Sequence, residues 1–141
     1  MNVFFDTSAF LKILKKEAGY VKVIEWLTKV RSGEHRGFTD SIVIAEMVYA
    51  FLAQGLDDEA VKARAYLEAV PNLVVVSDVS TSISHRAAEL KKRYFKRSER
   101  TFFSLYDALH LALAEKHCEL FITSDSDFRA VTEVRIELIS T

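Results

Sequence analysis

The sequence predicts an α/β fold in which one parallel sheet of about four to five strands is flanked by helices on both faces. Two observations lead to this prediction. The segments with strand character are short and apolar throughout, as in the mostly β-branched run Leu73-Val74-Val75-Val76, which is typical of strands buried on both faces. These segments alternate with longer ones of helical periodicity. With 4 Gly and 1 Pro in 141 residues, the composition also favours helices over an all-β sandwich.

The first half of the chain begins with the apolar strand Val3-Phe4-Phe5 and a turn at Asp6-Thr7-Ser8. A helix follows, because Phe10, Leu11 and Leu14 share one helical face. A second helix is predicted over residues 20–30 and a short strand over 37–39. An apolar helix over 42–53, capped by Asp40 or Ser41, comes next.

In the second half, a helix runs from Asp57 or Asp58 to about Ala69, and Pro71 stops it. The strand 73–76 precedes helices over about 84–93 and 104–116. Strands over 120–123 and 135–139 complete the sheet. Because the chain shows no linker and no internal repeat, we expect one domain over residues 1–141.

Composition limits the possible partners. Lys and Arg number 19 and Asp and Glu number 20, so a nucleic acid would have to be met by a local basic patch or through metal ions. The single cysteine, Cys118, excludes an intramolecular disulfide. The early Asp6 does not fit a signal peptide, and the longest apolar run, 42–53, is well short of the ~20 residues that cross a bilayer. We therefore expect a cytoplasmic protein that does not bind membranes.

Four acidic residues stand out by their positions. Asp6 and Asp125 each follow a predicted strand, so both carboxylates should project from the same edge of a parallel sheet, where such sheets bind ligands. Glu46 is the sole charge within 42–53, and Asp107 is the sole carboxylate within 105–114. Both helices are apolar nearly all round, which predicts that they are mostly buried.

Buried carboxylates must pair, take up a proton or bind a cation. Neither helix segment contains Lys or Arg, so converging carboxylates would make a divalent cation the natural partner. Ligands that are all oxygen favour Mg²⁺ or Mn²⁺ over zinc. Such a site can activate water and hold the phosphate of an in-line displacement.

Each acid taken singly also has a purely structural interpretation. Ser104-x-x-Asp107 and Ser124-x-x-Asp127 match a capping box, and Asp6 could cap the first helix. Glu46 resists this interpretation best, because it lies in the middle of its helix. The metal hypothesis rests on the set of four acids and not on any one of them.

Four motifs, in order along essentially the whole chain, carry a resemblance to a known family. They are Asp6-Thr7-Ser8 after the first strand, Ser41-x-x-x-x-Glu46 on an apolar helix, Tyr106-Asp107-Ala108 continuing as Leu109-His110-Leu111-Ala112, and Thr123-Ser124-Asp125-Ser126-Asp127-Phe128. Together they resemble the PIN domain, and most of all the VapC-like toxins of toxin–antitoxin pairs.

The resemblance implies a Mg²⁺- or Mn²⁺-dependent endoribonuclease that hydrolyses RNA with metal-activated water. It also implies a cognate antitoxin bound near the active site, and a homodimer. By position, the implied roles are an acidic catalytic and metal site of Asp6, Glu46, Asp107 and Asp125, an outer acid at Asp127 that contacts metal through water, and supporting hydroxyls at Thr7, Ser8 and Thr123.

Several alternatives stay open. A non-catalytic PIN-like module for RNA binding or scaffolding would have the same fold. An aspartyl phosphatase is disfavoured because Ser8 stands where a second Asp is needed, and a phospho-receiver because paired acids are missing near the first strand. His110, one helical turn after Asp107, is expected to be a buried, hydrogen-bonded histidine, although it could touch the site.

Residues 91–100 contain six basic residues and one acidic residue, with two phenylalanines close behind. Such a segment suits phosphate contact and base stacking, although it is also typical of a solvated helix end. The candidate RNA-binding residues are Lys92, Arg93, Lys96 and Arg97.

Overall fold

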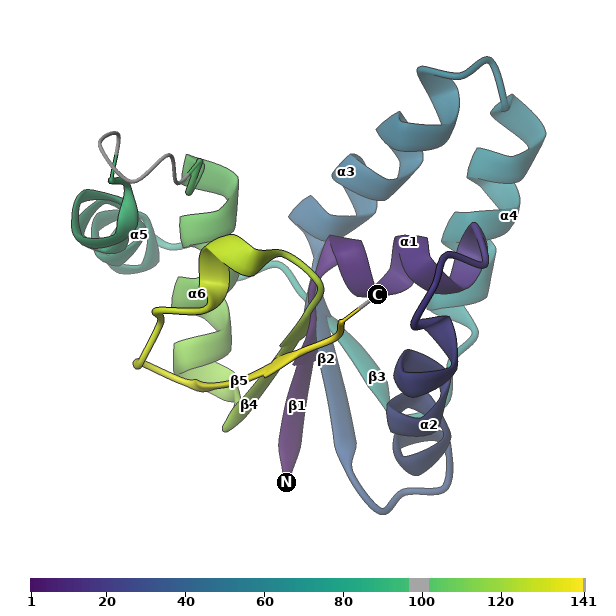
Figure 1. Ribbon diagram of the computed structural model, residues 1–141, viewed down its shortest axis with the longest axis horizontal. Coiled ribbons are helices and arrows are strands. Elements are labelled where there is room, and N and C mark those ends of the chain that lie inside the picture. The colour runs from purple at the N-terminus through teal and green to yellow at the C-terminus, as the bar shows by residue number, and fades with distance from the viewer. Residues whose placement is uncertain (97–101, 141) are drawn as a thin grey trace.

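The computed structural model describes residues 1–96 and 102–140, and it has three layers (Figure 1). A parallel five-stranded sheet in the order β3-β2-β1-β4-β5 forms the middle layer. This confirms the predicted fold class. The strands are β1 (Asn2–Phe5), β2 (Arg36–Asp40), β3 (Leu73–Val76), β4 (Leu120–Thr123) and β5 (Arg135–Leu138).

Helices cover both faces of the sheet (Figure 1). On one face lie α1 (Thr7–Leu14), α2 (Tyr20–Arg31), α3 (Ser41–Leu52) and α4 (Asp57–Glu68). On the other lie α5 (Thr81–Tyr94) and α6 (Leu105–His117). A short 3₁₀ turn, η2 (Ser126–Phe128), follows β4. The predicted helices are all present, with bounds that differ from the predictions by one to three residues at most ends.

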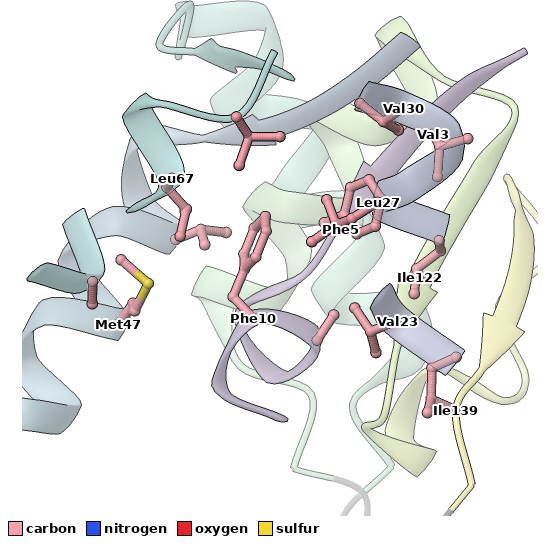
Figure 2. Close-up of a cluster of buried hydrophobic side chains, with 14 of the residues drawn as sticks. Val3, Phe5, Phe10, Val23, Leu27, Val30, Met47, Leu67, Ile122 and Ile139 are labelled. Carbon is pink, nitrogen blue, oxygen red and sulfur yellow. The ribbon is translucent and has the colours of Figure 1, made fainter. Parts of the chain in front are cut away.

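Two hydrophobic cores form because side chains alternate between the faces of a strand. Val3 and Phe5 of β1 point into the core beneath α1 to α4, together with Ile122 of β4 (Figure 2). Phe4 and Phe121 point the other way, where their rings stack at 5.2 Å beneath α5 and α6. Burial on both faces explains why these strands are apolar at every position.

The strand order sets where a ligand can bind. From the central β1 the chain builds outward through β2 and β3 on one side and through β4 and β5 on the other. The order therefore reverses between β1 and β4, and open α/β sheets bind ligands beyond the carboxyl ends of strands at such a point. The backbone N–H of Asp6 donates to the carbonyl oxygen of Ile122 at 3.0 Å, which holds these two strand ends together.

The prediction that the apolar helix 42–53 is mostly buried was wrong. Only Val43, Met47 and Phe51 of α3 are buried, whereas Tyr49 is 69% exposed and Leu52 45% exposed. The helix pairs with α4 and projects away from the sheet, so its opposite side meets solvent (Figure 1). Over the described residues, no helix combines the length and the apolar character needed to span a membrane.

Candidate active site

Asp6 lies at the carboxyl end of β1 and is 4% exposed. Its Oδ2 accepts hydrogen bonds from the hydroxyls of Thr123 at 2.8 Å and Ser8 at 3.1 Å. Burial raises the pKa of this carboxyl, although the charge of His110 and the two hydroxyls oppose the rise. Asp6 occupies the N-cap position of α1, but in the described chain its side chain caps no backbone N–H. Helix capping therefore does not account for this buried acid.

Asp125 and Asp127 follow β4 on the neighbouring strand end. The N–H of Asp125 donates to the hydroxyl of Thr123 at 3.0 Å, so Thr123 touches both strand-end acids. Asp125 Oδ1 accepts from the N–H of Asp127 at 2.9 Å and caps η2. The cap of this turn is thus Asp125 and not Ser124, contrary to the capping-box alternative. Asp127 Oδ2 accepts from the N–H of Phe102 at 3.2 Å.

Asp107 is both a helix cap and a member of the acidic group. It forms the predicted capping box with Ser104, in which each backbone N–H donates to the other residue's side chain at 3.0 Å. Burial raises the pKa of Asp107 to about 6. The N–H of Ser104 opposes the rise, while the negative charges of Asp6 and Asp125 add to it. Three carboxylates from three elements therefore share one electrostatic environment.

Glu46 reaches this region from the second turn of α3, and its side chain is 29% exposed. Its Oε1 accepts from the hydroxyl of Thr7 at 2.8 Å and lies 2.5 Å from Nε2 of His110. Burial alone would raise the pKa of Glu46, but the hydrogen bond and charge of His110, with the Thr7 hydroxyl, lower it overall. The pKa of Glu46 is therefore shifted in the opposite direction from those of Asp6 and Asp107, which burial raises.

His110 is fully buried on α6 and joins two acids. Its Nδ1 lies 2.6 Å from Oδ2 of Asp40, which is also fully buried, and its Nε2 faces Glu46. Burial would lower the pKa of His110, but these two carboxylates raise it to about 10. The expectation of a buried, hydrogen-bonded histidine is confirmed. Sequence reasoning missed its partner Asp40, which it treated as a helix cap alone.

The chemistry of the donors fits a divalent cation, because every candidate ligand is a carboxylate oxygen. Within residues 1–96 and 102–140, no three Asp, Glu, His or Cys side chains are gathered closely enough to hold a metal ion by themselves. Magnesium usually takes one or two carboxylates and keeps several waters, so these acids need not all contact the ion directly.

The model of the PIN domain family matches residues 3–134 of this sequence. The chain belongs to the PIN domain family. This membership argues against the phosphatase and phospho-receiver alternatives. No curated protein sequence matches the chain.

Solved structures share the fold over nearly the whole PIN domain. VapBC2 from Rickettsia felis, bound to a promoter DNA fragment, is 17% identical with a TM-score of 0.71, covering 97% of this chain and 98% of that one. Mycobacterium tuberculosis VapC20, a toxin that cleaves the sarcin-ricin loop, is 23% identical with a TM-score of 0.71, covering 94% and 98%. A toxin–antitoxin complex from Klebsiella pneumoniae is 19% identical with a TM-score of 0.66, covering 94% of each chain.

The candidate RNA-binding residues of the basic segment 91–100 differ in their surroundings. Lys92 and Lys96 are exposed at the end of α5 and just beyond it. Arg93 pairs at 2.5 Å with Glu133, whose side chain is 5% exposed and also accepts from the hydroxyl of Tyr94. Arg93 therefore anchors α5 to the segment before β5. Arg97 lies outside the described residues.

Proposed function

We propose that this PIN domain is a Mg²⁺- or Mn²⁺-dependent endoribonuclease that hydrolyses RNA phosphodiester bonds. The observation that supports the proposal is the electrostatic coupling of Asp107, on α6, with Asp6 and Asp125, the acids that follow β1 and β4. Burial raises the pKa values of Asp6, Asp107 and Asp125, and the negative charges of Asp6 and Asp125 add to the rise at Asp107. Acids that repel each other in the absence of metal are a natural site for a divalent cation.

The carboxylates of Asp6, Glu46, Asp107 and Asp125 would hold the cation, with Asp127 contacting it through water. A divalent cation in such a site supplies a water of lowered pKa and neutralises charge on the phosphate. The remaining polar groups position the acids. Thr123 and Ser8 fix Asp6, and Thr7 fixes Glu46, so two of the carboxylates are oriented before any ligand arrives.

The toxin of a toxin–antitoxin pair is the cellular role that we propose for this nuclease. The similar solved structures include VapBC assemblies, which supports a cognate antitoxin as a partner. Exposed apolar side chains on α3 and α4, including Tyr49, Leu52 and Val61, support contact with another chain. We propose both an antitoxin and a homodimer as partners, with light scattering of the purified protein as the test of the homodimer.

Cleavage of a mixed-sequence single-stranded RNA tests the nuclease. The purified protein is assayed with Mg²⁺ or Mn²⁺, with EDTA, and as Asp6→Asn and Asp58→Asn variants prepared identically. Asp58 is an exposed carboxylate in the first turn of α4, so its variant controls for loss of one negative charge. With metal present, we expect the wild type and Asp58→Asn to cleave the RNA and Asp6→Asn not to. Cleavage by the Asp6→Asn preparation would indicate a contaminating nuclease.

A non-catalytic RNA-binding or scaffold module is the alternative. It predicts no cleavage with either metal, and no rise in melting temperature when Mn²⁺ is added, because a ligand that binds only the folded state must stabilise it. Cleavage that persists in EDTA would contradict the metal mechanism. If the protein is a nuclease with a narrow substrate range, it would not cleave this RNA, but Mn²⁺ would still raise its melting temperature.

A further inference from the structure

A chain of hydrogen bonds runs from the interior to the edge of the acidic site through His110. Both ring nitrogens face carboxylate oxygens, Nδ1 at 2.6 Å from Asp40 and Nε2 at 2.5 Å from Glu46. Asp40 and His110 are fully buried, whereas the Glu46 side chain is 29% exposed. The solvent-facing end of this series of hydrogen bonds is therefore Glu46, the acid that we place in the metal site.

The two inner residues are fixed by their own elements. Asp40 ends β2, and its Oδ1 accepts from the N–H of Val43 at 2.8 Å, which caps the helix that carries Glu46. His110 lies on α6, one turn beyond Asp107, and its ring lies 6.3 Å from that of Phe4. His110 thus connects the helix of Glu46 with the helix of Asp107.

The bonds leave one oxygen of Glu46 available. Thr7 and His110 both contact Oε1. In the part of the chain that the structure describes, Oε2 accepts no hydrogen bond. A glutamate side chain has several rotatable bonds, and fixing one oxygen from two directions removes most of that freedom.

We propose that Asp40 and His110 are positioning residues that hold Glu46 by Oε1, so that Oε2 is presented to a divalent cation at the acidic site. This inference rests on the proposed metal-dependent function. Carboxylates only accept hydrogen bonds, so a ring placed between two of them donates from both nitrogens. Partners of this kind commonly orient the residues that bind metals, and their loss weakens metal affinity about 10–100-fold.

The first test measures the Mn²⁺ dissociation constant by calorimetry for the full chain. A His110→Gln variant can reach only one of the two carboxylates and is expected to weaken Mn²⁺ binding about tenfold or more. An Asp40→Asn variant keeps an oxygen to cap Val43 and an amide to pair with Nδ1, which leaves Nε2–H for Glu46. We expect it to retain most of the affinity.

A double-mutant cycle separates positioning from general loosening of the fold. If His110 acts through Glu46, His110→Gln has no further effect on Mn²⁺ binding in a Glu46→Gln background. Equal losses in both backgrounds would overturn the proposal, and so would an unchanged dissociation constant in His110→Gln alone. A wild-type protein that binds no Mn²⁺ would overturn the proposed function, and the positioning role with it.

A second measurement needs no substitution at His110. In ¹H–¹⁵N NMR spectra of the metal-free wild type, we expect proton resonances from both ring N–H groups of His110. Short hydrogen bonds to carboxylates should shift both resonances downfield. Glu46→Gln should move the Nε2–H resonance far more than the Nδ1–H resonance. An Nε2–H resonance that does not respond to Glu46→Gln would overturn the hydrogen-bond chain, even if His110→Gln does not fold.

Discussion

The hydroxyl of Thr123 donates a 2.8 Å hydrogen bond to Oδ2 of the buried Asp6, and so joins the carboxyl ends of β4 and β1 at the switch point of the sheet. The same hydroxyl oxygen accepts from the N–H of Asp125. The side chain of Thr123 therefore contacts both strand-end acids. Thr123 and Asp6 are 117 residues apart in the sequence.

Thr123→Val is expected to destabilise the protein by about 1–3 kcal/mol, because it leaves a buried carboxylate and a backbone N–H without this partner. Thr123→Ser keeps the hydroxyl and is the matched control. Urea denaturation in EDTA measures both free energies of unfolding. Equal stability of the Val and Ser variants would show that the bond to Asp6 contributes nothing.

Asp107→Asn is expected to abolish cleavage and yet to stabilise the metal-free protein. The pKa of Asp107 is raised from 3.8 to about 6, so the ionised carboxylate costs folding free energy above that pH. Removing the charge should raise the free energy of unfolding by about 1–2 kcal/mol at pH 8, a value that allows for the partial exposure of Asp107. Asparagine keeps an oxygen for the capping box with Ser104.

The sign of this effect fixes its pH dependence. As the pH falls through about 6 toward 3.8, the wild type protonates Asp107 in the folded state first and regains that stability. Melting curves in EDTA at pH 8 and pH 4 should therefore show the advantage of Asp107→Asn shrinking. An advantage that grows on acidification contradicts the raised pKa.

The His110 interaction predicts a loss of stability in alkali. Its folded pKa of about 10 lies above the ordinary 6.5, so its contribution is complete below about pH 6.5 and is lost as the pH rises through about 10. The difference in unfolding free energy between wild type and His110→Gln should narrow over this range. A constant difference from pH 6 to pH 10.5 would mean that the imidazolium does not contribute.

Charge reversal on the basic segment is expected to weaken RNA binding and leave Mn²⁺ binding unchanged. Lys92→Glu with Lys96→Glu should reduce the slope of log affinity against log salt by about 0.7 for each phosphate that the variant no longer neutralises. Lys22→Glu with Lys62→Glu, at two exposed lysines of α2 and α4, reverses the same number of charges and is the matched control.

If the Lys92→Glu, Lys96→Glu variant and the control bind RNA with the same affinity across a salt series, the segment is a solvated helix end. Arg93 is a poor probe of RNA contact, because it pairs with the nearly buried Glu133. Arg93→Glu would place two carboxylates together and is expected to lower stability whatever its effect on RNA.

The sequence determined the helices and strands, and it predicted the set of candidate acids. The strand at Leu73–Val76 and the Asp6 and Asp125 positions after strands could be recognised because apolar runs, helical periodicity and turn residues are local signals. The Ser104 and Asp107 capping box was visible for the same reason, since its partners are three residues apart. These motifs in order were also enough to suggest the PIN family.

The tertiary structure decided which side chains meet. His110 lies 70 residues from Asp40 and 64 from Glu46, and no periodicity within one element specifies such a pairing. The exposure of Tyr49 was also beyond the sequence, because an apolar helix face is buried only where another element covers it. Strand order brought these distant residues to one edge of the sheet, and a buried histidine then required partners that could satisfy both of its nitrogens.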